Sequence, residues 1–344
     1  MVHSCFIRVG CFERFDSLTA KRRLRSVRMR NYLLVTQAAE EAMKILVTGS
    51  TGLVGTALVK ALAGDGHTVC RLLRPQSKST SDSKGGFDVA WNPATGELGG
   101  AGVGPDAVVN LAGASIAGGR WTKDRKALLH SSRIDTTRAL VKALAKMNAR
   151  PRVLVSASAI GIYGNRGDEV LTEESKPGTD FLAGLAREWE TEALKAEALG
   201  IRVVLARFGI ILARHGGALA KMLLPFKLGA GGRLGSGKHW MSWITLEDVV
   251  GILKSMLENS TVRGPVNVVA PGAVQNAEFT KVLAKALHRP AIFPAPAFAI
   301  RLALGEMADA LLLSSQRVKP QRLQQLGYSF SQPELVAALS ALLS

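Results

Sequence analysis

A glycine-rich loop between a short apolar strand and a helix most constrains the fold of this 344-residue chain. Residues 45–47 read Ile-Leu-Val, and residues 49–55 read Gly-Ser-Thr-Gly-Leu-Val-Gly. Apolar residues at helical spacing then run over 56–63 and stop at Gly64. Glycines in such a loop permit a tight turn, close approach of a pyrophosphate, and close packing of helix on strand. The order predicts a dinucleotide-binding unit, with a purely structural turn as the alternative.

The second predicted strand, 67–73, indicates which dinucleotide this unit prefers. A carboxylate near its end would bind the ribose 2′-hydroxyl of NAD, but no Asp or Glu occurs between His67 and Ser81. Arg74 follows the strand instead. Because a guanidinium suits a 2′-phosphate, we predict NADP(H) rather than NAD(H). The alternative is that Arg74 is a solvated charge at a strand end.

Alternating strands and helices predict the rest of the fold. They indicate an α/β protein with a doubly wound, Rossmann-like parallel sheet, whose ligand crevice lies at the carboxyl ends of the strands. We divide the chain into an extension (1–42), a cofactor-binding domain (43–288) and a small C-terminal helical substrate region (289–344). The predicted strands are 44–48, 67–73, 107–111, 152–157 and 201–206, and the predicted longer helices are 56–63, 123–147 and 181–199.

The first 42 residues differ from the remainder in composition. They hold a basic run, 21–30, with six Lys or Arg in ten positions. The segment is either an organellar transit peptide or the product of a mis-assigned start, because Met43 directly precedes the first strand. We expect a cytoplasmic protein, or an organellar one if the transit-peptide interpretation holds.

Charge and cysteine content narrow the partners. The net charge is +17, but outside 1–42 it is dispersed over the chain, which favours solubility and phosphate binding over DNA binding. The three cysteines are widely spaced, so we expect neither a disulfide framework nor a metal site. No apolar run reaches the ~18 residues of a membrane helix. We predict a small-molecule substrate and no nucleic-acid or membrane partner.

Several motifs make the chain resemble a known family. Thr-Gly-x-x-Gly-x-x-Gly at 48–55, Asn-Leu-Ala-Gly at 110–113 and Tyr-Gly at 163–164 resemble the extended short-chain dehydrogenase/reductases of the epimerase/dehydratase type. Gly-Glu-Met-Ala at 305–308 and Ser-Gln-Arg-Val-x-Pro at 315–320 resemble an atypical subgroup. That subgroup is the SDR39U1/YfcH-like epimerase-family proteins, which carry a DUF1731-type C-terminal region.

The resemblance implies an NADP-binding oxidoreductase or epimerase. Some bacterial relatives carry a cell-division-inhibitor label, and a plant relative acts in plastid division. Arg133 matches the family arginine that contacts the cofactor, although a salt bridge on a helix surface is the alternative role. The cofactor-binding positions that the resemblance and the glycine motif imply are Gly49, Thr51, Gly52, Leu53, Val54, Gly55, Leu73, Arg74, Leu111, Ala112, Arg133 and Ile211.

One departure from the family pattern concerns the reaction itself. Short-chain reductases use Tyr-x-x-x-Lys, in which the lysine lowers the pKa of the tyrosine so that it can exchange a proton. None of the three tyrosines here has a lysine four residues later, and the corresponding segment, 180–190, carries Phe181 and Leu182. We therefore expect an atypical NADP(H)-binding oxidoreductase or epimerase. The alternative is a non-catalytic NADP(H)-binding regulatory or interaction protein linked to cell division.

Other side chains could take over the proton transfer. Ser158 lies where the family has its catalytic serine, with a strand-end serine that satisfies the backbone as the alternative. Tyr163 could swing in from a loop, and His239 could act as a general acid. Glu173 and Glu174 look like a solvated pair. We name Ser158 as the catalytic candidate.

Overall fold

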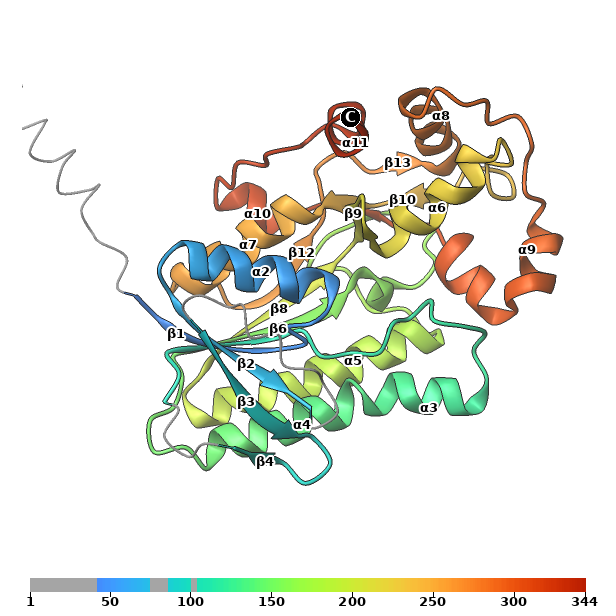
Figure 1. The fold of residues 1–344 in the computed structure, drawn as a ribbon. Helices are drawn as coiled ribbons and strands as arrows, with labels where there is room; N and C mark the ends of the chain where they lie inside the picture. The colour runs from blue at the N-terminus through green and yellow to red at the C-terminus, as the bar shows by residue number, and fades with distance from the viewer. Residues whose placement is uncertain (1–41, 75–85, 100–103) are drawn as a thin grey trace, which may run out of the picture. The chain divides into compact units, whose positions relative to one another are not determined.

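The computed structural model describes residues 42–74, 86–99 and 104–344. Its core is an eight-stranded sheet in the order β12-β8-β6-β5-β1-β2-β3-β4, parallel throughout except for the β3–β4 pair. Figure 1 shows helices on both faces of this sheet. The strands are β1 (Lys44–Thr48), β2 (Thr68–Leu73), β3 (Gly86–Asn92), β4 (Glu97–Leu98), β5 (Ala107–Asn110), β6 (Val153–Ala159), β8 (Arg202–Phe208) and β12 (Gly264–Val268).

The direction in which strands are added reverses between β1 and β5. From β1 the chain adds β2 and β3 on one side, and from β5 it adds β6, β8 and β12 on the other. Thr48 at the end of β1 is the register partner of Asn110 at the end of β5. The predicted doubly wound fold is confirmed, and ligands of such sheets bind at the carboxyl ends beside this reversal.

Alternate residues of β1 enter different cores on the two faces of the sheet. Ile45 and Val47 pack in one cluster with Leu58 of α2, whereas Leu46 packs in another with Leu140 of α4. Because helices cover both faces, the central strands are apolar along their length. The helices involved are α2 (Leu53–Gly64) and α7 (Leu246–Glu258) on one face, and α4 (Ile134–Ala145) and α5 (Phe181–Leu194) on the other.

The prediction of one long helix over 123–147 is wrong. The structure has two helices there, α3 (Lys123–Ser131) and α4, and the chain turns between them at Ser132 and Arg133. The Ser132 hydroxyl accepts a hydrogen bond from the Ala114 backbone N–H at 3.0 Å, and the Arg133 guanidinium donates to the carbonyl of the same residue. These bonds to a distant loop interrupt a segment whose local apolar spacing is helical throughout.

The other predicted elements lie within a few residues of the observed ones. The helix expected from residue 56 begins earlier, at Leu53, because α2 starts inside the glycine loop. The helix expected over 181–199 is α5 continued by a 3₁₀ turn, Lys195–Leu199, and it ends at Gly200 with a φ of 79°. Glycine adopts this left-handed conformation at the lowest cost, so the sequence could indicate this end.

The C-terminal segment shares a core with earlier parts of the chain. Leu339 of α11 packs in one cluster with Leu283 of α8 and Leu219 of α6. The domain boundary after residue 288 stays a prediction, and residues 1–41 lie outside the described part of the chain. The remaining elements are η1 (Ile160–Tyr163), β7 (Val170–Leu171), β9 (Ile210–Ala213), α6 (Gly217–Lys227), β10 (Trp240–Met241), β11 (Trp243–Thr245), β13 (Val274–Gln275), α8 (Asn276–Ala286), α9 (Ala297–Leu304), η3 (Ala308–Leu312), β14 (Arg317–Val318), α10 (Gln321–Gln325) and α11 (Leu335–Leu343).

Asp248 fastens the start of α7 to the loop before α11. Its fully buried carboxylate accepts hydrogen bonds from the Thr245 hydroxyl at 2.9 Å and from the backbone N–H groups of Ser331 and Gln332 at 2.7 and 3.1 Å. Thr245 in turn accepts from the Asp248 backbone N–H as the N-cap of the helix. A single buried carboxylate therefore holds two distant segments together.

Replacing this carboxylate is expected to destabilise the protein. Asp248→Ala leaves the buried Thr245 hydroxyl and two half-buried backbone N–H groups without their acceptor, so we expect a loss of about 2–4 kcal/mol in the free energy of unfolding, measured by urea denaturation. Glu247→Ala is the control, because Glu247 is the exposed neighbour in the same helical turn. A similar loss in both variants would contradict the role assigned to Asp248.

Candidate functional site

The glycine loop closes tightly against the end of β5. Gly49 has a φ of 65°, and a Cβ there would lie 2.5 Å from the Leu111 carbonyl oxygen. A Cβ on Gly55 would lie 2.1 Å from the Gly49 carbonyl oxygen. No side chain fits at either position, so the backbone itself lines the loop. The Ser50 hydroxyl in this loop is buried and lacks a hydrogen-bond partner in the described structure, which leaves it available to a ligand oxygen.

A threonine and an asparagine hold this edge of the sheet together. The Thr48 hydroxyl donates to Asn110 Oδ1 at 2.7 Å and accepts from the backbone N–H groups of Leu111 and Ala112 at 3.1 and 3.2 Å. Asn110 Nδ2 donates to the Thr137 hydroxyl at 2.9 Å. The predicted residues Leu111 and Ala112 are thereby fixed beside the glycine loop. Sequence reasoning assigned no role to Thr48 or Asn110, although both stand within the motifs it used.

Leu73 and Arg74 lie at the same edge as the glycine loop. Leu73 is the buried last residue of β2, which pairs with β1, and Arg74 is exposed immediately after it. Arg74 has no ion-pair partner among the described residues. The neighbouring Arg71 forms an ion pair with Asp88. Lys78, the next cation along the chain, lies outside the described residues. The position of Arg74 therefore agrees with a role toward a ligand in the crevice.

The structure brings Leu53 and Ile211 together from distant parts of the chain. A Cβ on Gly217 would lie 3.1 Å from Leu53 Cδ2 and 3.3 Å from the Ile211 carbonyl oxygen, so this glycine stands between them. Of the other predicted loop residues, Thr51 and Gly52 are exposed and Val54 is half-buried.

Arg133 is a half-buried cation without an acidic partner among the described residues. Its guanidinium donates to the carbonyls of Leu129 and Ala114 at 3.2 and 2.9 Å, and it lies 5.2 Å from the centre of the Trp189 ring. Burial, together with the charge of Arg125, lowers its pKa to about 10. The alternative of a salt bridge on a helix surface is therefore not what the structure shows.

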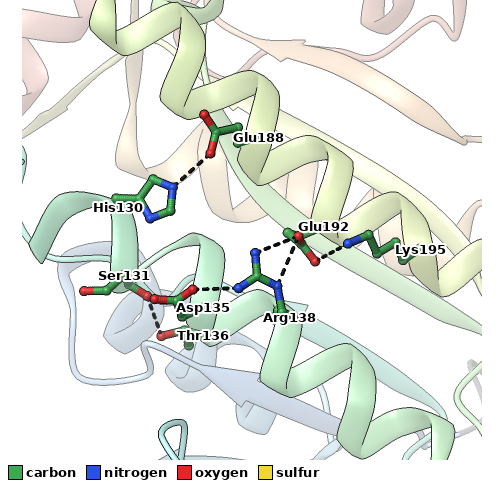
Figure 2. Close-up of polar contacts among 8 residues, drawn as sticks. All are labelled: His130, Ser131, Asp135, Thr136, Arg138, Glu188, Glu192 and Lys195. Atoms are coloured by element: carbon green, nitrogen blue, oxygen red, sulfur yellow. Dashed lines mark hydrogen bonds and ion pairs between the residues drawn. The ribbon is translucent and has the colours of Figure 1, made fainter. Parts of the chain in front are cut away.

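Neighbouring cations on these helices do have carboxylate partners, as Figure 2 shows. His130 contacts Glu188 at 2.9 Å. Arg138 contacts Asp135 at 2.8 Å and Glu192 at 2.9 Å. The three nearby acids are thus paired with His130 or Arg138, and none of them forms an ion pair with Arg133.

Ser158 donates to a carboxylate rather than to the backbone. It is buried at the end of β6, and its hydroxyl donates to Glu190 Oε1 at 2.6 Å. Arg207 of β8 binds both oxygens of Glu190 at 2.8 Å. Burial alone would lower the pKa of Arg207, but its hydrogen bonds and charge interaction with Glu190 raise it overall. The Arg207 guanidinium therefore stays charged although it is buried. The sequence signals for this pair were an acid, Glu190, on the apolar face of α5 and an arginine, Arg207, within the strand β8.

Tyr163 cannot swing into the crevice as its loop position suggested. Its side chain is fully buried, and its hydroxyl donates to Asn267 Oδ1 at 2.7 Å and accepts from Arg207 at 2.9 Å. Burial raises its pKa. The prediction that Glu173 is solvated is also wrong. Glu173 is buried and accepts from the backbone N–H groups of Asn267 and Arg322 at 3.0 and 3.2 Å, whereas Glu174 is exposed.

Apolar side chains begin α5, in the segment where the sequence resemblance placed the family tyrosine. Phe181 begins α5, and its ring packs edge-to-face with Trp121 at 5.3 Å. The Lys126 ammonium lies 4.8 Å from the centre of the same ring. Leu182 follows in the helix, and neither side chain can exchange a proton.

Burial lowers the pKa of His239, which favours its neutral form, and no other cause contributes. Within residues 42–74, 86–99 and 104–344, no three His, Cys, Asp or Glu side chains are grouped so that they could hold a metal ion. No helix in these ranges has the length and apolar character that crossing a membrane requires.

Two family profiles together match most of the chain. Residues 45–270 match the NAD dependent epimerase/dehydratase family. Residues 295–342 match a domain of unknown function, DUF1731. The first match contains the whole glycine loop, the end of β5 and the Ser158 region.

Known proteins resemble the chain over nearly their whole length. An epimerase family protein of Mycobacterium bovis is 42% identical over 296 residues, which cover 86% of this chain and 96% of that protein. The chloroplastic SDR39U1 homolog of Arabidopsis thaliana is 38% identical and covers 90% of each chain. The crystal structure of human epimerase family protein SDR39U1 with NADPH is 35% identical, covers 87% of this chain and 99% of that chain, and has a TM-score of 0.76.

The Glu190–Arg207 pair is expected to be essential to the fold. Glu190→Ala leaves the Arg207 guanidinium buried and uncompensated, which costs about 3–5 kcal/mol in the free energy of unfolding. Urea denaturation measures this loss. Glu188→Ala is the matched control on the same helix, because Glu188 is exposed and its pair with His130 is worth about 1 kcal/mol at most. Equal losses in the two variants would show that the buried pair is not special.

Proposed function

Because the chain belongs to the NAD dependent epimerase/dehydratase family, and within it to the SDR39U1-like proteins, we propose that it is an atypical NADP(H)-dependent oxidoreductase or epimerase acting on a small molecule. The observation that carries the proposal is the tightly closed glycine loop, called the cradle below, which packs so closely against the end of β5 at Gly49 and against itself at Gly55 that no Cβ fits at either glycine. It lies at the carboxyl edge of the sheet, beside the reversal of strand order. The NADPH bound to the human relative supports the choice of cofactor.

The residues around the cradle fit a dinucleotide. The loop from Gly49 to Gly55 and the N-terminus of α2 would hold the pyrophosphate, through backbone N–H groups and the helix dipole. Leu73 and Arg74 would lie at the adenosine and its 2′-phosphate, and Leu111 and Ala112 at the adjoining ribose. Arg133 would add a positive charge to the same cofactor, and Ile211 would contact its nicotinamide side.

The chemistry of the site then depends on Ser158. A bound nicotinamide would supply or accept a hydride. The single proton of Ser158 is directed at Glu190, so only lone pairs of Oγ remain for a substrate. Ser158 is therefore a hydrogen-bond acceptor that orients a substrate hydroxyl or a water molecule. This polarity is opposite to that of a serine that donates to a substrate carbonyl.

A second candidate function follows from the apolar site at Phe181. Because neither Phe181 nor Leu182 can exchange a proton, the chain would bind NADP(H) as a regulatory or interaction protein without turnover. Incubating the protein with NADPH and a panel of carbonyl compounds and sugar nucleotides separates the two functions. Oxidation of NADPH or interconversion of a sugar supports the enzyme, whereas tight binding without any turnover supports the second function.

Arg74 is expected to select NADP(H). Arg74→Ala removes charge-assisted hydrogen bonds to the 2′-phosphate, so the dissociation constant for NADPH increases about 10–100-fold while that for NADH changes little. Calorimetric titration of both dinucleotides measures this. Lys60→Ala, which removes an exposed charge from α2, is the control. An equal effect of Arg74→Ala on both cofactors would remove Arg74 from the 2′-phosphate site.

The cradle itself can be tested with two glycines of the same helix. Gly55→Ala introduces a Cβ 2.1 Å from the Gly49 carbonyl oxygen, so we expect it to abolish detectable binding of both NADPH and NADH. Gly64→Ala is the matched control, because nothing lies within 4 Å of its Cβ position. Circular dichroism verifies that each variant is folded. Undiminished binding by folded Gly55→Ala would place the cofactor elsewhere.

A further inference from the structure

Two arginines donate to consecutive carbonyls of the loop that follows β5. Arg133 Nη2 donates to the Ala114 oxygen at 2.9 Å, and Arg125 Nη2 donates to the Ser115 oxygen. Adjacent residues of one loop therefore bind both guanidinium groups. Their mutual repulsion contributes to the lowered pKa of Arg133. Holding two like charges close together costs free energy, because each disfavours the charged form of the other.

No acidic side chain compensates this pair. Among the described residues, neither Arg125 nor Arg133 has a carboxylate partner. Arg125 Nε is buried and has no hydrogen-bond acceptor within the described part of the chain. By contrast, Lys126, the next residue of α3, is paired with Glu306 at 2.5 Å. Burying charge without compensation costs free energy, so an anion that binds here would supply the negative charge that the described side chains do not.

The pair lies next to the proposed reaction centre. Lys126, one residue after Arg125, contacts the ring of Phe181, which stands in the position of the family tyrosine. A Cβ on Gly113 would lie 3.2 Å from Arg133 Cζ, and Gly113 belongs to the motif that ends β5. The Trp189 ring, which lies 5.2 Å from the Arg133 guanidinium, is in the same helix as Glu190, which accepts the hydrogen bond of Ser158. An anion held at the pair would thus lie near the carboxyl ends of β5 and β6.

We propose that Arg125 and Arg133 form an anion subsite that binds a carboxylate or phosphate group of the substrate. This inference rests on the proposed function, since it assigns the substrate class of that site. Guanidinium groups bind such oxyanions through paired N–H donors. In the proposed site Arg133 would also contact the cofactor, whereas Arg125 would contact the substrate alone. The substrate is therefore an anionic small molecule whose charged group is separated from its reacting carbon.

The test uses the full chain saturated with NADP+, with inorganic phosphate and malonate as probes. Binding of each probe is followed by the shift in melting temperature at constant ionic strength, set with chloride so that screening is equal. We expect at least one probe to bind with saturation, and Arg125→Gln to weaken it about tenfold or more. Lys123→Gln is the control, because it removes an exposed charge from the same helix without affecting the pair.

The outcomes separate this inference from the proposed function. Phosphate binding alone identifies a phosphorylated substrate, and malonate binding alone a carboxylate. Binding of neither probe overturns the subsite. A probe that binds the cofactor-free protein but is displaced by NADP+ assigns the pair to the cofactor, which also overturns the subsite.

Calorimetric titration with NADP+ tests the proposed function independently, since Arg125→Gln is expected to leave the affinity for NADP+ within about twofold. A lower melting temperature of cofactor-free Arg125→Gln with unchanged probe affinity would assign Arg125 a structural role only.

Discussion

The hydrogen bond between Thr48 and Asn110 joins the two strands at which the sheet reverses direction, and the rest of the site depends on it. It fixes the ends of β1 and β5 in register at 2.7 Å. The glycine loop can then approach the Leu111 carbonyl so closely that no Cβ fits at Gly49. The same threonine orients the loop that carries Ala114 and Ser115, and thereby both arginine-bound carbonyls. One polar contact therefore connects the cofactor cradle to the proposed anion subsite.

A second interaction determines what chemistry this edge can perform. The Glu190–Arg207 pair is buried, and it is tolerated because its remaining donors and acceptors are used by Ser158 and Tyr163. The pair connects α5 to β6, β8 and η1. In doing so it directs the proton of Ser158 away from the crevice and locks Tyr163 in the core. Two hydroxyls that could have exchanged protons with a substrate are thus used within the fold. The Tyr163 hydroxyl both donates and accepts there, whereas Ser158 uses only its proton.

The basic side chains of the described residues differ in whether they have acidic partners. Arg138, Lys195 and His130 have carboxylate partners on the outer helices (Figure 2). Three arginines near the ends of β2 and β5 have none among the described residues: Arg74, Arg125 and Arg133. They lie around the proposed cofactor cradle and the loop that follows β5. This distribution supports a site for a phosphorylated cofactor with an anionic substrate beside it.

The sequence by itself determined the features that depend on a few adjacent residues. These were the glycine loop, the ends of the buried strands, the stop at Gly200, the missing acid after β2, and the absence of Tyr-x-x-x-Lys. Backbone sterics and apolar spacing act locally, so they can be read from a short segment. Only the tertiary structure decided how buried polar side chains are paired. Ser158 and Glu190 are 32 residues apart, and Tyr163 and Asn267 are 104 apart. Buried polar groups pair with whichever partners the folded core brings near, because leaving them unpaired costs free energy, and this leaves no local sequence pattern. The break between α3 and α4 likewise depends on hydrogen bonds to a distant loop.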